Sequence, residues 1–179
     1  MITKKQKGQH SKLGKFKLVN KLAIGVVISL GLFGSGALAA AQGHLQVTSK
    51  VQKMVYVNKG GKRVPTYIPA VKVLPGEILQ YNTFFQNISG KAAANINIVN
   101  PIPKHTVYLP NSAQGHNTHI VFSVDGGKHY GKAGSLKVRA RDGKIYPAKP
   151  SDYTHIRWQY NGSLPPKQRK AVGFKVRLL

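Results

Sequence analysis

The amino-acid sequence predicts an all-β protein, an antiparallel β-sandwich of about seven to eight strands. Three observations lead to this prediction. After residue 41, apolar residues recur at every second position, helical periodicity is nearly absent, and clusters of glycine, proline and asparagine separate the apolar segments. Such clusters are typical of turns, because glycine adopts positive φ angles and proline lacks the N–H that a ladder needs. Strands with one apolar face must cover one another, so two packed sheets are expected.

Six segments alternate clearly, and each is expected to point its apolar residues inward. They cover residues 45–57, 77–87, 95–103, 119–125, 154–160 and 171–179. The residues expected on the inner faces are Leu45, Val47, Val51, Val55, Val57, Leu79, Tyr81, Thr83, Phe85, Ile96, Ile98, Ile120, Phe122, Val124, Ile156, Trp158, Tyr160, Val172, Phe174, Val176 and Leu178. No internal repeat or long linker divides this region, so residues 42–179 are expected to form a single domain.

Residues 1–41 are predicted to be a signal peptide. Seven lysines and no acidic residue precede an apolar run from Leu22 to Ala41, which ends with Ala-x-Ala processing sites at Ala37/Ala39 or Ala39/Ala41. An uncleaved signal anchor is the alternative, because about 20 apolar residues just span a bilayer. Since the basic residues precede the apolar run, both alternatives place residues 42–179 outside the cytoplasm, in a periplasmic, cell-surface or extracellular location.

Composition excludes several classes of chemistry. The chain has no cysteine, so thiol catalysis, cysteine zinc sites, iron–sulfur clusters and disulfides are excluded. Lysine and arginine number 28 against 4 acidic residues. A field of one sign attracts polyanions, which indicates an anionic partner. A basic surface that only solubilises the protein is the alternative.

Residues 73–113, VLPGEILQYNTFFQNISGKAAANINIVNPIPKHTVYLPNSA, resemble a conserved-repeat family of bacterial and archaeal envelope proteins, known as domain of unknown function eleven (DUF11). The family pattern runs from Pro-Gly-Asp/Glu through an Asn-x-x-Gly turn to Asp-Pro-Ile-Pro and Thr-x-Tyr. The matching residues here are Pro75, Gly76, Glu77, Tyr81, Asn87, Gly90, Ala94, Asn95, Ile98, Pro101, Pro103, Thr106, Tyr108 and Ser112. Similarity to single-domain members extends over roughly residues 50–178.

The resemblance implies an immunoglobulin-like sandwich in a secreted or cell-surface protein, and it implies no catalytic reaction. One residue departs from the family pattern: Asn100 stands where aspartate is usual before Pro-Ile-Pro. This departure weakens the expectation of a cation site at that loop.

The segment SVDGGKHYG, residues 123–131, resembles the Asp-box turn of sialidases and other β-propellers, Ser-x-Asp-x-Gly-x-Thr-Trp, with His129 in place of threonine. A propeller needs several four-stranded blades, whereas this chain has one copy of the motif. The segment is therefore predicted to be a hairpin turn that Asp125 caps and to which Gly126 and Gly127 give backbone freedom.

Candidate catalytic and metal-binding residues are sparse. The exported region holds only four acidic residues, Glu77, Asp125, Asp142 and Asp152, all in turn-like contexts, which disfavours a glycosidase. The weak candidates for a metal site are His116, His119 and His129, because neutral imidazoles bind zinc or copper. Their spacing matches no standard motif, so we expect no metal, no cofactor and no enzymatic activity.

Basic residues give the stronger functional hypothesis. Lys137, Arg139 and Arg141 alternate, so they share one face if their segment is a strand. The last two strands of an immunoglobulin-like sandwich are neighbours, so Arg157, Lys175 and Arg177 are expected on one outer face. These six residues are the candidate polyanion-binding site. Protection of exposed strands against aggregation is the alternative explanation for their charge.

The function expected from the sequence is that of a non-enzymatic structural or adhesive module of the bacterial envelope. Its expected partner is an envelope protein or an anionic polymer such as lipopolysaccharide, teichoic acid or an acidic glycan. Membrane contact is expected only through an uncleaved leader or anionic head groups. Nucleic acid is not expected, because the domain is exported and Trp158 and Tyr160 face the core. The alternatives are a periplasmic assembly factor that pairs a strand edge with a partner, and a metal-binding or hydrolytic protein.

Overall fold

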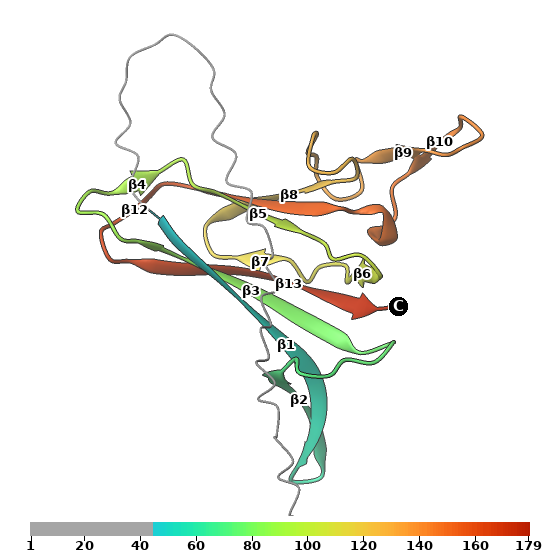
Figure 1. Cartoon of the computed structure of the whole chain (residues 1–179), viewed down its shortest axis with the longest axis horizontal. Coiled ribbons are helices and arrows are strands. Elements are labelled where there is room, and N and C mark those ends of the chain that lie inside the picture. The colour runs from blue at the N-terminus through green and yellow to red at the C-terminus, as the bar shows by residue number, and fades with distance from the viewer. Residues whose placement is uncertain (1–44) are drawn as a thin grey trace, which may run out of the picture.

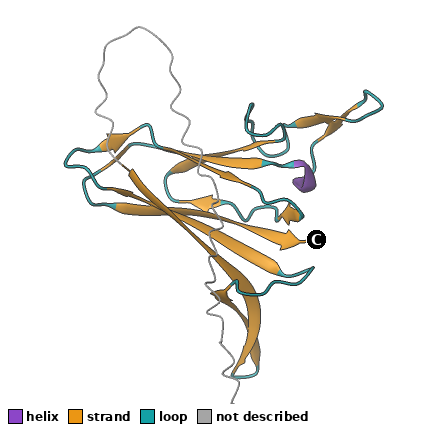
Figure 2. Ribbon diagram, in the orientation of Figure 1, coloured by secondary structure: helices purple, strands orange, loops and turns teal. Residues whose placement is uncertain are grey.

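The computed structural model describes residues 45–179; the predicted signal peptide, residues 1–41, lies outside the described residues. This part of the chain consists of strands joined by loops, with one 3-10 turn at Pro150–Asp152 (Figure 2). The strands are β1 (Leu45–Lys59), β2 (Lys62–Pro69), β3 (Ile78–Asn87), β4 (Ala93–Ala94), β5 (Asn97–Pro101), β6 (Thr106–Tyr108), β7 (Gln114–Gly115), β8 (Thr118–Ser123), β9 (Lys137–Arg139), β10 (Ile145–Pro147), β11 (His155–Tyr160), β12 (Ser163–Leu164) and β13 (Arg169–Leu178). None of the helical segments among residues 45–179 has the length and hydrophobicity needed to cross a bilayer.

Two antiparallel sheets make up the sandwich (Figure 1). The large sheet has the order β2-β1-β3-β13-β6, and β7 also pairs with β13. The small sheet has the order β5-β11-β8. Two short pairs, β9–β10 and β4–β12, stand apart from these sheets. The predicted all-β antiparallel sandwich is confirmed, and seven of the strands between residues 45 and 179 have five residues or more.

The core lies between the two sheets and is built mainly from the inner faces that the alternation predicted, although Val55 and Val57 lie in the hairpin outside it. Its largest buried apolar side chains are Trp158, Phe85, Phe174, Ile156, Leu164, Val172 and Val176. The rings of Trp158 on β11 and Phe174 on β13 lie 6.0 Å apart between their centroids, so they join the two sheets. Each fully buried aromatic or aliphatic side chain of this kind stabilises the fold by about 1.5–3 kcal/mol relative to exposure.

One polar contact also joins the sheets inside the core. Asn100 of β5 is 6% exposed, and its Nδ2 donates to Oγ1 of Thr83 on β3 over 2.7 Å. The Thr83 hydroxyl in turn contacts the Ser49 hydroxyl of β1 at 3.2 Å. A buried amide costs little when it is hydrogen-bonded in this way. Asn100 therefore faces the core and bridges the two sheets.

The hairpin of β1 and β2 was not predicted in full. β1 pairs with β3 from Leu45 to Met54 and with β2 from Gln52 to Lys59, so its second half continues beyond β3 and carries the hairpin away from the sandwich (Figure 1). The sequence did not predict β2 because Pro65 and Pro69 interrupt its alternation. Proline is tolerated there because β2 is an edge strand, which needs donors on one side only.

The expectation that the last two long strands are neighbours was wrong. β11 pairs with β5 and β8 in the small sheet, whereas β13 pairs with β3, β6 and β7 in the large sheet. The short strand β12 and the loop after it carry the chain from one sheet to the other. Alternation fixes which side chains face inward, but it is the same for a strand in either sheet.

Candidate functional site

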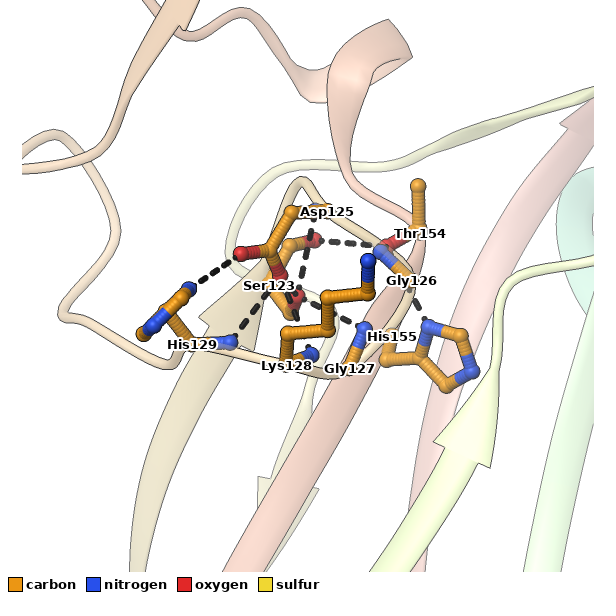
Figure 3. A network of polar contacts seen from close by, with 8 residues as sticks. All are labelled: Ser123, Asp125, Gly126, Gly127, Lys128, His129, Thr154 and His155. Atoms are coloured by element: carbon orange, nitrogen blue, oxygen red, sulfur yellow. Dashed lines mark hydrogen bonds and ion pairs between the residues drawn. The ribbon is translucent and has the colours of Figure 1, made fainter.

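The loop after β8 contains the segment SVDGGKHYG and holds a cluster of hydrogen-bonded polar groups (Figure 3). Phe122 and Gly131 close the loop through two backbone hydrogen bonds of 2.8 and 2.9 Å. The fully buried Ser123 hydroxyl donates to Oδ1 of Asp125 over 2.7 Å and accepts from the Gly127 amide over 3.0 Å. The predicted tight hairpin turn is wrong in form: the segment is a loop over residues 123–130, which a single isolated bridge between Phe122 and Gly131 closes without a second strand.

Asp125 caps this loop as predicted. Its Oδ1 accepts from the backbone amides of Lys128 and His129 at 3.1 and 3.0 Å, and its Oδ2 lies 2.6 Å from Nδ1 of His129. These hydrogen bonds, that of the His129 backbone amide first, hold the pKa of the Asp125 carboxyl well below its usual range. Gly126 and Gly127 provide φ angles of 78° and 86°, which the turn requires.

The cluster contains serine, aspartate and histidine, but their arrangement does not activate the serine. Asp125 lies between the other two side chains, so Ser123 contacts the carboxylate and His129 contacts the same carboxylate from the other side. A nucleophilic serine needs a histidine as its hydrogen-bond partner and an open path to substrate. Ser123 is 0% exposed, and its hydroxyl is occupied by the loop backbone. The hydrogen bonds of Ser123, Asp125 and His129 therefore serve to hold the loop in one conformation.

Tyr130 folds from this loop onto the outer face of the small sheet. The Arg157 guanidinium lies 4.0 Å from the centroid of the Tyr130 ring. Gly127 leaves room for this arrangement, because a Cβ on Gly127 would lie 3.0 Å from the Tyr130 hydroxyl and 3.5 Å from the His155 ring. Burial lowers the pKa of His155, and the nearby Asp125 carboxylate partly opposes that shift. Arg157 is thus half-buried under Tyr130, which limits its access to a large polymer.

The three candidate metal ligands make separate contacts. Nδ1 of His119 lies 3.0 Å from Oε1 of Gln159, His129 contacts Asp125, and His116 is exposed in the loop after β7. Among residues 45–179, no group of three or more histidine or acidic side chains is placed to hold a metal ion. The structure therefore does not assemble His116, His119 and His129 into one site.

The six predicted polyanion-binding residues do not form one surface. Arg157 lies on the outer face of the small sheet, whereas Lys175 and Arg177 lie on the outer face of the large sheet, on the opposite side of the sandwich. The expectation that these three share a face was wrong, because it depended on β11 and β13 being neighbours.

The other three predicted residues lie on or next to the β9–β10 ribbon. Lys137 and Arg139 share one face of β9, but Arg141 falls in the turn that follows. Nη1 of Arg139 donates to the Gly143 carbonyl over 2.8 Å, which ties this side chain to its own turn. The alternation predicted for the three side chains thus holds only for the first two.

The outer face of the large sheet gathers basic and neutral polar side chains in regular rows across β1, β3 and β13. The rows, in the order β1–β3–β13, are Gln46–Gln86–Arg169, Thr48–Phe84–Ala171, Lys50–Asn82–Gly173, Gln52–Gln80–Lys175 and Met54–Ile78–Arg177. The hairpin adds Tyr56, Arg63 and Tyr67 to the same face, since these alternate with the inward residues. We call this surface the amide face.

The amide face carries no carboxylate side chain among residues 45–179. Glu77 precedes β3 and pairs with Lys53 on the inner side of the sheet at 3.1 Å. The aspartates Asp125, Asp142 and Asp152 lie in loops next to the small sheet or the ribbon. Positive charge on the amide face is therefore not neutralised locally.

Two arginines of the amide face lie on aromatic rings instead. The Arg169 guanidinium lies 4.2 Å from the centroid of Phe84, and that of Arg63 lies 5.0 Å from the centroid of Tyr56. Stacking holds a guanidinium flat and leaves its N–H edges available to an anion. The sequence signal for this face lies in the polar positions between the inward residues of 77–87.

Side chains of β13 and β2 meet across the amide face. Nζ of Lys175 on β13 lies 5.4 Å from the ring centroid of Tyr67 on β2, although β3 and β1 lie between these two strands. These two long side chains thus meet over the intervening strands. Gln80, which lies beneath, is only 5% exposed for the same reason.

Comparison of the chain with family models, with curated proteins and with solved structures finds no match. The resemblance to the DUF11 envelope family stays a prediction.

Proposed function

We propose that this protein is an exported, non-enzymatic β-sandwich that binds anionic polymers of the cell envelope through its amide face. The observation that carries the proposal is the absence of any carboxylate on that face of the described chain, combined with four cations, Lys50, Arg169, Lys175 and Arg177, along its rows. A surface of one sign draws polyanions to it. The leader predicted from the sequence would export the domain to the side of the membrane where such polymers occur.

The described residues leave most positive charge unpaired. Lys53–Glu77 and Lys144–Asp142 are the lysine–carboxylate pairs found among residues 45–179, and no arginine in that range pairs with a carboxylate. Arg63, Arg157 and Arg169 contact aromatic rings, while Arg139 and Arg177 donate to backbone carbonyls. Unpaired guanidinium groups bind carboxylate and phosphate groups with well-defined geometry.

The rival function, assembly of a partner through a strand edge, has less support at β2. This edge strand contains Pro65 and Pro69, and proline in an edge strand hinders the pairing of a further strand. The amide face, in contrast, presents exposed polar side chains such as Gln46, Thr48 and Arg177.

The test compares two variants that remove equal charge from different places. The amide-face variant is Arg169→Gln, Lys175→Gln and Arg177→Gln; the control is Lys137→Gln, Arg139→Gln and Arg141→Gln on the ribbon. Binding to heparin and to anionic vesicles is measured by isothermal titration at several ionic strengths. Each cation near an anionic surface contributes about 1 kcal/mol, so we expect the amide-face variant to lose about 100-fold or more in affinity at low salt.

The control variant should lose much less. Equal losses in both variants would mean that net charge alone drives binding and that the amide face has no special role. Absence of binding by the unaltered protein at low ionic strength would refute the proposed function.

A further inference from the structure

One end of the amide face has a hollow that is lined by neutral polar and aromatic side chains as well as by a cation. It has a volume of about 140 Å³ and is lined by Gln46, Thr48, Phe84, Gln86 and Arg169. These residues form the first two rows across β1, β3 and β13, so three neighbouring strands hold them in register. We call this hollow the Arg169 subsite.

Arg169 provides the cationic group of the subsite. Its guanidinium lies on the Phe84 ring at 4.2 Å from the centroid, and within the described residues it forms no ion pair or side-chain hydrogen bond. A guanidinium held in this way presents two parallel N–H groups to a planar acid. The subsite thus suits a carboxylate, sulfate or phosphate substituent.

The other side chains suit a different kind of group. Nε2 of Gln86 donates to the Lys167 carbonyl over 3.1 Å, which orients this amide and leaves its carbonyl oxygen available as an acceptor. Thr48 and Gln46 are exposed on the adjacent strand and offer a hydroxyl and a second amide. An amide carbonyl accepts hydrogen bonds, so it repels the oxygen atoms of a bare anion but binds a hydroxyl group.

The same combination continues along the face. Nε2 of Gln80 donates to Oδ1 of Asn82 over 3.2 Å, and Nδ2 of Asn82 approaches Oε1 of Gln52 at 3.5 Å. Gly173 opposite leaves the space for these amides, because a Cβ there would lie 2.9 Å from Oδ1 of Asn82 and 3.0 Å from Nε2 of Gln80. The neutral amides of Gln80 and Asn82 therefore lie between Arg169 and Lys175, and Lys50 stands at the β1 end of the Asn82 row.

The spacing of the two cations fits an extended polymer. Arg169 and Lys175 lie on the same face of β13 and are six residues apart, a distance of about 20 Å along a strand. A ligand that reaches both must be an extended chain, and hydroxyl groups between its acid groups match the intervening amides of Gln80 and Asn82. A compact anion reaches only one of the two cations.

We infer that the polymer bound by the amide face is an acidic polysaccharide, lying along β13 with one acidic sugar unit in the Arg169 subsite. This inference rests on the proposed function and specifies its ligand. The Phe84 ring and the guanidinium that covers it provide the flat surface, the amides of Gln46 and Gln86 and the Thr48 hydroxyl bind sugar hydroxyls, and Arg169 binds the acid group.

The test keeps every charge and removes only the neutral groups. The variant Gln46→Met with Thr48→Val is compared with the control Gln159→Met on the outer face of the small sheet. Affinities for polygalacturonate, which carries both hydroxyls and carboxylates, and for inorganic polyphosphate, which has no sugar hydroxyls, are measured at low ionic strength. Each hydrogen bond lost should weaken binding by about two- to tenfold.

We expect the double variant to bind polygalacturonate at least about fivefold more weakly, with polyphosphate binding unchanged. The control should bind both polymers as the unaltered protein does. Thermal denaturation of all variants verifies that they are folded, and both altered side chains are exposed.

Two results would overturn the inference while leaving the proposed function intact: equal weakening toward both polymers, or unchanged affinity of the double variant for polygalacturonate. Binding of polyphosphate but not of polygalacturonate would do the same. If the unaltered protein binds neither polymer, the proposed function fails and this inference fails with it.

Discussion

Asn87 uses its whole side-chain amide within the protein. It is 0% exposed, and its Nδ2 donates to the carbonyls of Lys91 and Leu164 at 2.7 and 2.8 Å. Its Oδ1 accepts from the amide and the hydroxyl of Ser89 at 3.0 and 2.8 Å. One side chain therefore fixes the turn after β3 and ties it to β12, which explains why an asparagine opens the Asn-x-x-Gly turn.

Replacing Asn87 with aspartate should destabilise the fold strongly. The substitution removes the N–H groups that donate to the carbonyls of Lys91 and Leu164, and it places a carboxylate against these two carbonyl oxygens in a buried site. We expect the free energy of unfolding to fall by about 2–4 kcal/mol, since each unsatisfied buried group costs about 1–3 kcal/mol. Urea denaturation at neutral pH measures this loss.

The exposed Asn97 provides the matched control, because its Nδ2 makes a single 3.3 Å contact with the Asn95 carbonyl. The substitution Asn97→Asp should change the free energy of unfolding by about 0.5 kcal/mol or less, as expected for a surface site. Similar losses at both positions would contradict the role assigned to Asn87.

At the scale of an element, the loop over residues 123–130 should respond to acid through Asp125. Its pKa in the folded protein lies below the ordinary value of 3.8, so the charged carboxylate stabilises the fold at higher pH. That stabilisation is complete above about pH 5 and is lost as the pH falls below 3.8 toward the pKa of Asp125 in the folded protein. Asp125→Asn should lower the thermal midpoint at pH 7 and flatten its decline below pH 4.

Thermal denaturation between about pH 2 and pH 7 verifies this expectation. Some acid dependence should remain in the variant, because hydrogen bonds from the Leu74 amide and from Lys53 also lower the pKa of Glu77. Asp142→Asn serves as control, since Asp142 contacts only its own turn, through the amide and the ammonium group of Lys144. If the thermal midpoint of Asp125→Asn falls with acid as steeply as that of the unaltered protein, the loop does not need the charge.

Strand faces and turns were predictable from sequence because both depend on neighbouring residues. The inward positions Ile156 and Trp158 follow from alternation, and the loop at Asp125 follows from its turn residues. The sheet that holds β13 was not predictable, because pairing joins residues far apart in the chain. A row such as Gln46–Gln86–Arg169 was not predictable for the same reason, because its members become neighbours only through β-sheet register.

The whole molecule should become more stable as salt screens its positive charge. The chain has 28 basic and 4 acidic residues, and 7 of the basic ones lie in the predicted leader, so like charges still outnumber opposite ones in the described domain and repel one another. The Debye length falls from about 30 Å at 0.01 M salt to about 8 Å at 0.15 M, which removes the long-range part of this repulsion. We expect the thermal midpoint to rise by about 3–6 °C over this range, corresponding to about 1 kcal/mol.

Differential scanning calorimetry in sodium chloride measures the shift, with an equal osmolarity of sucrose as the uncharged control. A midpoint that stays constant or falls with salt would mean that the charges are too widely spaced to repel one another appreciably.

The arrangement of β1 and β13 on either side of β3 has a mechanical consequence. Both strands are antiparallel to β3, so they run in the same direction. β1 begins opposite Asn87 and β13 ends beyond Ile78, at opposite ends of β3 (Figure 1). Tension applied between residues 45 and 178 therefore pulls along the strands and shears the hydrogen bonds of both ladders together, since these bonds lie across the strands. Sheared ladders yield at higher force than ladders that unzip bond by bond, so we expect this sheet to resist tension applied in that direction.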